Sequence, residues 1–204
     1  MRNMFKKDKL KYILALIFTL ILTSCTLEPV PSTDLRSIDK DKVKFDTGFM
    51  SDEYFDPTSG SFGGNIYQID TASPNQGYYF NIYEYKNGNI SNISRTDDFY
   101  IAKDEYLVVE TLSGNIHSVI FGDDKYQNIL DYKYKNDKIF EKNNSIWNWT
   151  DDGDFKNGGI FIFSSSHSDK KNVNSYDLNE TGLDALTRDK SVSGIVIELR
   201  LSDE

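Results

Sequence analysis

The sequence predicts a mainly β fold, an antiparallel β-sandwich or barrel of about nine short strands with one short helix near the C-terminus. Two observations lead to this prediction. The 204-residue chain contains 13 tyrosines and 13 phenylalanines, and these aromatic residues cluster with β-branched ones in short runs that suit a pleated, half-buried surface. Clusters of Gly, Asn, Asp and Ser separate the runs about every ten residues, as turns separate the strands of an all-β domain.

The strands are predicted from residue 43 onward. The predicted strands are residues 43–46, 65–70, 78–85, 105–111, 116–121, 129–134, 138–142, 159–164 and 195–201. In the last of them, aliphatic side chains alternate with polar ones, which predicts one buried face and one open face. Residues 105–111 and 116–121 are expected to form one hairpin, and residues 129–134 and 138–142 a second, because each pair flanks a short run of turn-forming residues.

One helix is predicted at residues 181–190, before the last strand. Thr181 and Asp184 stand three positions apart, a spacing similar to that of an N-terminal capping pair. Leu183 and Leu186 can share one face of such a helix. The prediction is therefore one short helix near the C-terminus.

The N-terminus has the pattern of a secretory signal peptide. The first eleven residues carry five basic residues and one acidic residue, and residues 12–22 run almost without a polar group. This run is short for a transmembrane helix, which needs about 20 apolar residues, and it ends at small polar residues. These features favour cleavage of the segment over its retention in the membrane.

The only cysteine of the chain, Cys25, follows directly. Residues 22–25, Leu-Thr-Ser-Cys, resemble the lipobox of bacterial lipoprotein precursors. The resemblance covers the first 25 residues and implies that residues 1–24 are removed and that Cys25 becomes an acylated N-terminus, carrying a diacylglycerol thioether and an acyl chain such as palmitate. Two or more acyl chains anchor a protein stably. The alternative role of Cys25, a small buried hydrophobe, leaves an odd cysteine in an exported chain unexplained.

The segment after the cysteine predicts the location and the domain boundaries. The resemblance implies the outer membrane or the cell surface, because Thr26 replaces the Asp that holds many such lipoproteins at the inner membrane. Residues 25–40 contain prolines, charges and hydroxyls without a sustained apolar period, and are predicted to be the acylated N-terminus and a flexible tether. Residues 41–204 are predicted to be a single β-rich domain.

The chain that remains after the predicted cleavage is strongly acidic. Loss of residues 1–24 removes five basic residues and one acidic residue and leaves 18 basic against 31 acidic ones, a net charge of −13. Phosphate backbones and anionic lipid headgroups repel such a surface. Nucleic acid is therefore not an expected partner, and membrane contact is expected only through the lipid. The composition, rich in Lys, Asn, Ile, Asp and Tyr, resembles that of surface lipoproteins of AT-rich bacteria such as spirochaetes.

A candidate ligand site lies in residues 146–159. Trp147 and Trp149 are two positions apart, so that in a strand they project from one face. The polar residues that follow are Asp151, Asp152, Asp154 and Asn157. Aromatic rings beside carboxylates and amides suit a carbohydrate site, since rings cover the apolar faces of sugars and polar groups bond to the hydroxyls. Two other interpretations are a tryptophan pair that fills the core beside a solvated turn, and a calcium loop, although the spacing departs from that of an EF-hand.

Signals of catalysis are few. His117 lies in a predicted strand and His167 in a predicted loop, and no Gly-x-Ser-x-Gly motif supports a Ser-His-Asp triad. No catalytic residue, cofactor or metal is therefore expected. We expect a non-enzymatic interaction module that binds a protein or a glycan, as an adhesin or a surface antigen does. The alternative is a lipid-anchored glycan hydrolase or a small-ligand carrier on the same β scaffold.

Overall fold

The computed structural model describes residues 33–39, 43, 63–70, 73, 75–112, 115–122, 125–134, 144–169 and 173–202. The predicted signal peptide, the lipobox with Cys25 and the predicted strand at residues 138–142 lie outside these residues. Among the helices that fall within them, none has both the length and the apolar character needed to cross a bilayer.

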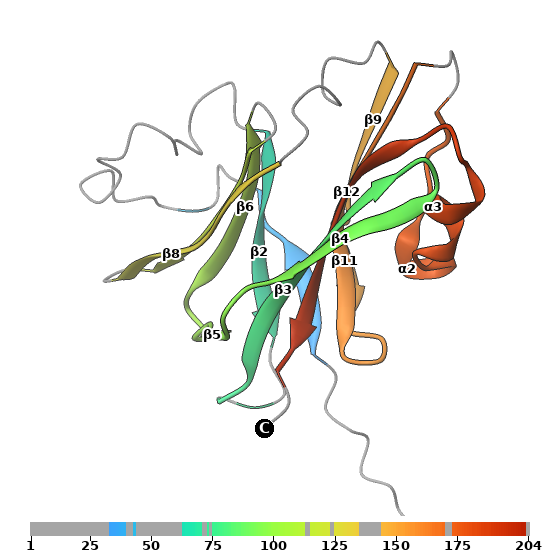
Figure 1. The fold of residues 1–204 in the computed structure, drawn as a ribbon. Coiled ribbons are helices and arrows are strands. Elements are labelled where there is room, and N and C mark those ends of the chain that lie inside the picture. Colours follow the sequence, from blue (N-terminus) through green and yellow to red (C-terminus); the bar gives the residue numbers. More distant parts are fainter. Residues whose placement is uncertain are drawn as a thin grey trace, which may run out of the picture. The chain divides into compact units, whose positions relative to one another are not determined.

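Two antiparallel sheets make up the fold, and the first has the strand order β10-β1-β2-β6-β7-β8 (Figure 1). Its strands are β1 (Asp34–Ser37), β2 (Gly64–Asp70), β6 (Tyr106–Leu112), β7 (Asn115–Gly122), β8 (Lys125–Lys133) and β10 (Asp152–Asp154). Strands β6, β7 and β8 pair in sequence order, whereas β10 joins β1 from the far part of the chain. One edge strand of the first sheet, β10, thus comes from the second half of the domain sequence.

The second sheet has the order β4-β3-β12-β11-β9, with the short β5 also paired to β3. Its strands are β3 (Gly77–Lys86), β4 (Asn89–Arg95), β5 (Phe99–Tyr100), β9 (Asn144–Trp149), β11 (Gly159–Ser168) and β12 (Ser193–Leu201). The last strand, β12, lies at the centre and pairs with β3 over its whole length. The predicted fold class is confirmed, and its architecture is the sandwich.

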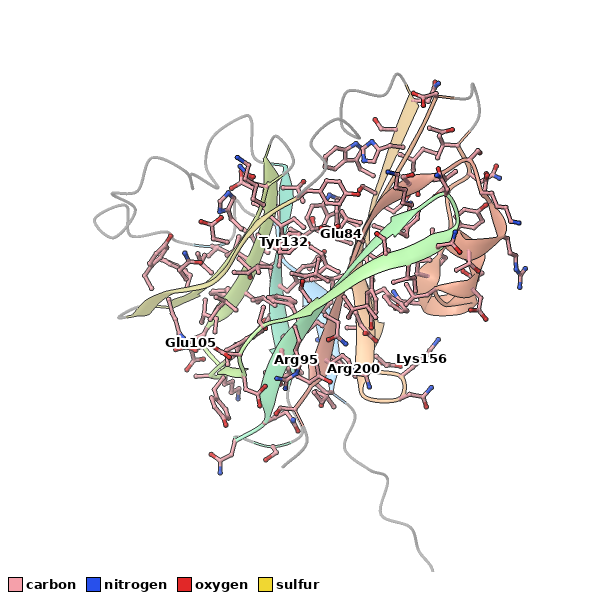
Figure 2. All side chains as sticks on the ribbon, in the orientation of Figure 1. Glu84, Arg95, Glu105, Tyr132, Lys156 and Arg200 are labelled. Carbon is pink, nitrogen blue, oxygen red and sulfur yellow. The ribbon has the colours of Figure 1, made fainter. Side chains whose placement is uncertain are left out.

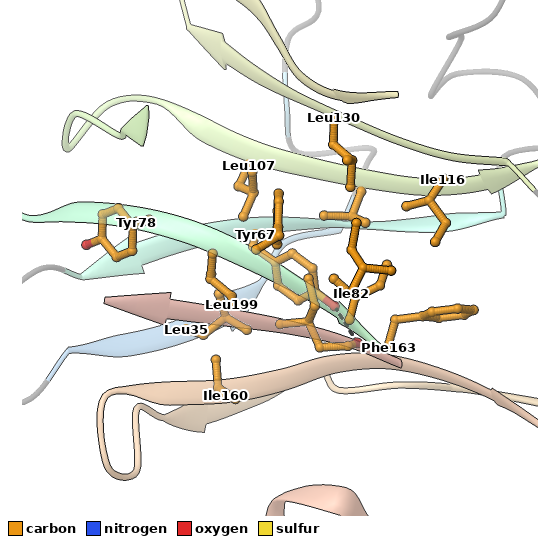
Figure 3. Packing of buried hydrophobic residues seen from close by; sticks show 14 of the residues in the cluster. Leu35, Tyr67, Tyr78, Ile82, Leu107, Ile116, Leu130, Ile160, Phe163 and Leu199 are labelled. Carbon is orange, nitrogen blue, oxygen red and sulfur yellow. Dashed lines mark hydrogen bonds between the residues drawn. The ribbon is translucent and has the colours of Figure 1, made fainter. Parts of the chain in front are cut away.

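The inner faces of the two sheets meet in one apolar core (Figure 3). Leu107 and Ile120 reach it from the first sheet and Ile82 from the second, and each is at most 1% exposed. Burial of each such side chain stabilises the fold by about 1.5–3 kcal/mol. One polar contact also joins the sheets, since the hydroxyl of Tyr132 on β8 donates a hydrogen bond to Glu84 on β3 (Figure 2).

The outer face of the second sheet carries two short helices, α2 (Leu178–Thr181) and α3 (Asp184–Arg188). Leu178 and Leu186 pack there against Tyr85 and Val196 in a second apolar cluster. The prediction of an open face for the last strand is therefore wrong: even Glu198, on that face, is only 6% exposed. Helices α2 and α3, which lie between β11 and β12 in the sequence, cover this face of the sheet. The alternation within one strand does not predict that cover.

The single helix predicted at residues 181–190 is also wrong in its bounds. Asp177, rather than Thr181, caps the first of two helices, and its carboxylate accepts a hydrogen bond from Asn179 N at 3.0 Å. Thr181 ends that helix, and Gly182 follows with a φ of 69°, a left-handed value that glycine adopts without strain. This glycine separates α2 from α3, and only α3 falls within the predicted range.

Most strand predictions on described residues are confirmed within a few residues, with three corrections. Strand β11 is four residues longer than predicted and includes His167, which the sequence places in a loop, because β9 and β12 pair with it on both sides. Strand β1 lies inside the predicted tether, so the domain begins before residue 41. Val43 lies outside a strand and is buried beside Ile66.

Candidate binding groove at the crossover between the sheets

The chain passes from the second sheet to the first between Trp149, the end of β9, and Asp152, the start of β10. Both sheets hold this crossover. Thr150 donates its N–H to the carbonyl of Ile162 on β11 at 3.0 Å, and its own carbonyl accepts from the hydroxyl of Tyr67 on β2 at 2.9 Å. Burial raises the pKa of Tyr67 well above its ordinary value, so this hydroxyl stays a neutral donor.

Trp147 and Trp149 project from the same face of β9 and both contact Phe163 on β11. The ring centroids of Trp147 and Trp149 lie 5.8 Å and 4.5 Å from that of Phe163. Trp149 is half-buried and packs against the main core, whereas Trp147 is 40% exposed and also lies 5.7 Å from the ring of His167. The two rings thus extend the core to the edge strand of the second sheet.

Asn179 fixes helix α2 against β11, beyond the point where β9 stops pairing. Its side-chain oxygen accepts from Phe161 N at 2.9 Å, and its amide nitrogen donates to Phe161 O at 2.9 Å. The same amide nitrogen donates to the hydroxyl of Thr150 at 3.1 Å. Since β9 pairs with β11 only as far as Phe163, the amide of Asn179 takes the place of a neighbouring strand for Phe161.

A groove of about 490 Å³ lies between the crossover and α2. Its aromatic residues are Trp149, Phe161, Phe163 and Tyr176, and its charged residues are Asp151, Asp152, Asp154, Lys156, Asp177 and Glu180. Four of the six residues predicted for a ligand site therefore line one groove. The other two, Trp147 and Asn157, do not line it.

Asn157 has a different role, in the turn that leads into β11. Asn157 and Gly158 have φ values of 53° and 76°, as the two central residues of a type I′ turn require. The carbonyl of Asn157 accepts a hydrogen bond from Arg200 Nη2 at 3.0 Å. The Asn-Gly pair is therefore explained by the turn.

The three aspartates of the predicted site differ in their partners. Asp151 Oδ1 accepts from the amide of Asn65 at 3.4 Å, and Asp152 Oδ1 accepts from the backbone N–H of Ser37 at 3.0 Å. Asp154 makes no side-chain hydrogen bond or ion pair with another described residue. All three are exposed, so each keeps at least one oxygen open to the groove or to solvent.

In the part of the chain that the structure describes, these carboxylates are not grouped around a metal site, and neither histidine lines the groove. Among the described residues, no group of three or more His, Cys, Asp or Glu is placed to hold a metal ion, so the calcium interpretation gains no support. His117 lies on β7 of the first sheet, 3.4 Å from Asp131. His167 is fully buried on β11 of the second sheet.

Sequence reasoning missed the helical side of the groove. Tyr176, Asn179 and Glu180 line it, and only the groove's geometry brings these residues next to the acidic stretch. One signal was present: Asp177 and Glu180 stand three apart at the start of α2, a spacing similar to that of a capping box.

Comparison with known proteins gives no match: no protein-family model, no curated protein and no solved structure is significantly similar to this chain.

Proposed function

We propose that the chain is a lipid-anchored binding module, held at the outer membrane or cell surface through Cys25, whose groove binds a saccharide without chemical turnover. The observation that carries the proposal is the groove between the crossover and α2, whose lining combines half-buried aromatic residues with exposed acidic residues. The resemblance of residues 22–25 to a lipobox supports the anchor. The acidic composition fits display at a distance from anionic headgroups.

The size and chemistry of the groove suit a small glycan. Its volume of about 490 Å³ falls within the roughly 300–1,000 Å³ of typical ligand pockets. Trp149 and Tyr176 are half-buried, so each keeps part of a ring surface for the apolar face of a sugar, while carboxylates accept hydrogen bonds from hydroxyl groups.

The walls of the groove are held in place before a ligand arrives. Asn179 ties α2 to the backbone of Phe161, and Ser175 donates to Asn148 Oδ1 at 2.8 Å. A preformed site loses little conformational entropy on binding. This rigidity supports a binding module that needs no partner-induced folding.

Binding is tested by calorimetric titration of the mature chain with trisaccharides of equal length: cellotriose, tri-N-acetylglucosamine, triglucosamine and trigalacturonate. We expect saturable binding of at least one of them. The Asp151→Asn/Asp152→Asn variant should weaken it tenfold or more, because the loss of even one charge-assisted bond, on the order of 1.5 kcal/mol, lowers the affinity about tenfold. Asp97→Asn/Asp104→Asn, which changes two exposed carboxylates outside the groove, is the matched control. Binding of none of the four sugars would contradict the proposal, and release of new reducing ends would contradict its non-enzymatic part.

The anchor is tested separately, in cells fed with radiolabelled palmitate. The full chain should incorporate the label and sediment with membranes. Cys25→Ala should lose the label, because the chain has no second cysteine. Unchanged labelling of this variant would contradict lipidation at Cys25.

A further inference from the structure

The charges that line the groove have mostly one sign. Five carboxylates, those of Asp151, Asp152, Asp154, Asp177 and Glu180, stand against one ammonium group among the described residues of the lining, that of Lys156. All six are exposed residues. A ligand in the groove therefore meets a negative potential beside an aromatic wall.

Two of these carboxylates hold no other described residue in place through their side chains. Asp154 and Glu180 make no side-chain hydrogen bond or ion pair with any other described residue. Asp177, in contrast, caps α2 through the N–H of Asn179, and Asp151 and Asp152 each use one oxygen in the crossover. Asp154 and Glu180 thus offer both oxygens to a ligand.

The amide groups of the groove are already committed. Asn148 accepts from Ser175 and donates to the hydroxyl of Ser164 at 3.4 Å. Asn179 uses its oxygen and its nitrogen on Phe161. The polar groups left for a ligand are mainly acceptors, so a well-bound ligand must supply donors.

The nearby guanidinium groups do not balance this charge. Arg36, on the neighbouring β1, forms ion pairs with Asp34 and Asp70. Arg200 donates to Glu198 Oε1 at 2.8 Å and to the carbonyl of Asn157 at 3.0 Å. Among the lining residues that the structure describes, Lys156, at the turn, is the one cation without a side-chain partner (Figure 2). Uronates and other anionic glycans therefore meet more repulsion than attraction in the groove.

We infer that the groove selects a saccharide with unsubstituted, protonated amino groups, of the glucosamine type. The inference rests on the proposed function and names the ligand class of that same site. A protonated amine supplies up to three donors in charge-assisted hydrogen bonds to Asp154 and Glu180. The ring faces of the same sugar fit the wall at Trp149, where a cation is also favoured. Acetylation of the amine removes the charge and two of the donors while it leaves the ring faces unchanged.

The test compares triglucosamine with tri-N-acetylglucosamine, trigalacturonate and trilysine on the mature chain, by calorimetric titration at pH 6 in low and high salt. We expect triglucosamine to bind at least about tenfold more tightly than its acetylated form. Its affinity should fall in high salt. Trigalacturonate should have the lowest affinity of the three sugars. Asp154→Asn/Glu180→Gln should bring triglucosamine to the affinity of the acetylated trimer. Asp97→Asn/Asp104→Asn, the matched change outside the groove, should keep at least half of the preference.

The outcomes separate this inference from the proposed function. Equal affinity for the amino and the acetylated trimer overturns the inference and leaves glycan binding standing. Binding of none of the sugars overturns both. If trilysine binds with the same affinity as triglucosamine, the inference is overturned, because the groove then recognises positive charge and not a sugar. Because Asp154 and Glu180 bond to no described residue, the double variant should fold normally, which its circular dichroism and thermal unfolding check.

Discussion

Two acidic regions of the domain differ in how their carboxylates are held. On the outer face of the second sheet, Glu198 is buried and accepts hydrogen bonds from Tyr83 at 2.6 Å, Asn81 at 3.2 Å and Arg200 at 2.8 Å. In the groove, Glu180 is exposed and bonds to no described residue. A buried carboxylate with a full set of donors is part of the fold, since removal of it strands those donors. An exposed carboxylate contributes little to stability and is available to a ligand.

The largest expected effect is that of Glu198→Ala. This change leaves Tyr83, Asn81 and Arg200 without their shared acceptor, and we expect it to lower the free energy of unfolding by about 3 kcal/mol, below the upper range for buried pairs because Arg200 is partly exposed. Glu180→Ala is the matched control and should change it by less than about 0.5 kcal/mol. Chemical denaturation of both variants measures the difference. If both variants lose the same free energy of unfolding, Glu198 contributes no more to the stability of the fold than Glu180 does.

Alkaline pH should weaken the parts of the fold that buried tyrosine hydroxyls hold together. Burial raises the pKa values of Tyr67 and Tyr85, and burial and then Glu198 raise that of Tyr83. In the unfolded chain these phenols ionise near pH 10, whereas in the folded chain they stay protonated. Their contribution is therefore fully present below pH 10 and is lost as the pH rises further, by up to about 1.4 kcal/mol per pH unit for each fully buried phenol.

Denaturant titrations at pH 8, 10 and 11 measure this loss. Tyr85→Phe should be less stable than the parent chain at pH 8, because it lacks the hydroxyl that donates to Ser165 O at 2.8 Å. It should also lose stability less steeply above pH 10. An unchanged slope in this variant would show that Tyr85 does not take part in the alkaline transition.

Asn179→Ala tests whether the side chain of Asn179 stabilises the packing of α2 against β11. The change leaves the N–H of Phe161 without its side-chain partner and removes one of two donors to its carbonyl, which still accepts from the hydroxyl of Thr150 at 2.7 Å. We expect a loss of about 1–2 kcal/mol in the free energy of unfolding. Asn128→Ala, an exposed strand position whose side chain bonds to no described residue, is the matched control and should cost less. If the two variants unfold alike, α2 is held by its apolar contacts rather than by this amide.

The contrast between the two regions also shows what the sequence could predict. The alternation in residues 195–201 correctly placed Ile195 and Ile197 on one face and Glu198 on the other, because side-chain direction in a strand depends only on position. It did not predict that the Glu198 face would be covered. Whether this face is covered depends on where α2 and α3 pack, and their packing is set by tertiary contacts.

The candidate site shows the same limit. The spacing of Trp147 and Trp149 predicts a shared face, and the acidic run after them predicts an exposed turn. No local pattern indicates that the chain changes sheets at Thr150, or that Asn179, about thirty residues later, bonds to Thr150 and completes the groove. Likewise the serines before His167 favour a loop in isolation, and only pairing with two neighbouring strands makes them part of β11. Local propensity yields to these long-range contacts.

The smallest expected effect concerns the two tryptophans, which are the only ones in the chain. Trp147→Phe and Trp149→Phe each leave one indole, and acrylamide is the suitable quencher because the acidic surface repels iodide. Trp147, at 40% exposure, should be quenched more strongly than the half-buried Trp149. A glycan in the groove should protect Trp149, which lines it, and leave the quenching of Trp147 unchanged. Protection of Trp147 alone would move the site along β9, from the crossover beside Trp149 toward His167. In that case the carboxylates of the groove would have no more part in ligand binding than the exposed carboxylate of Asp97.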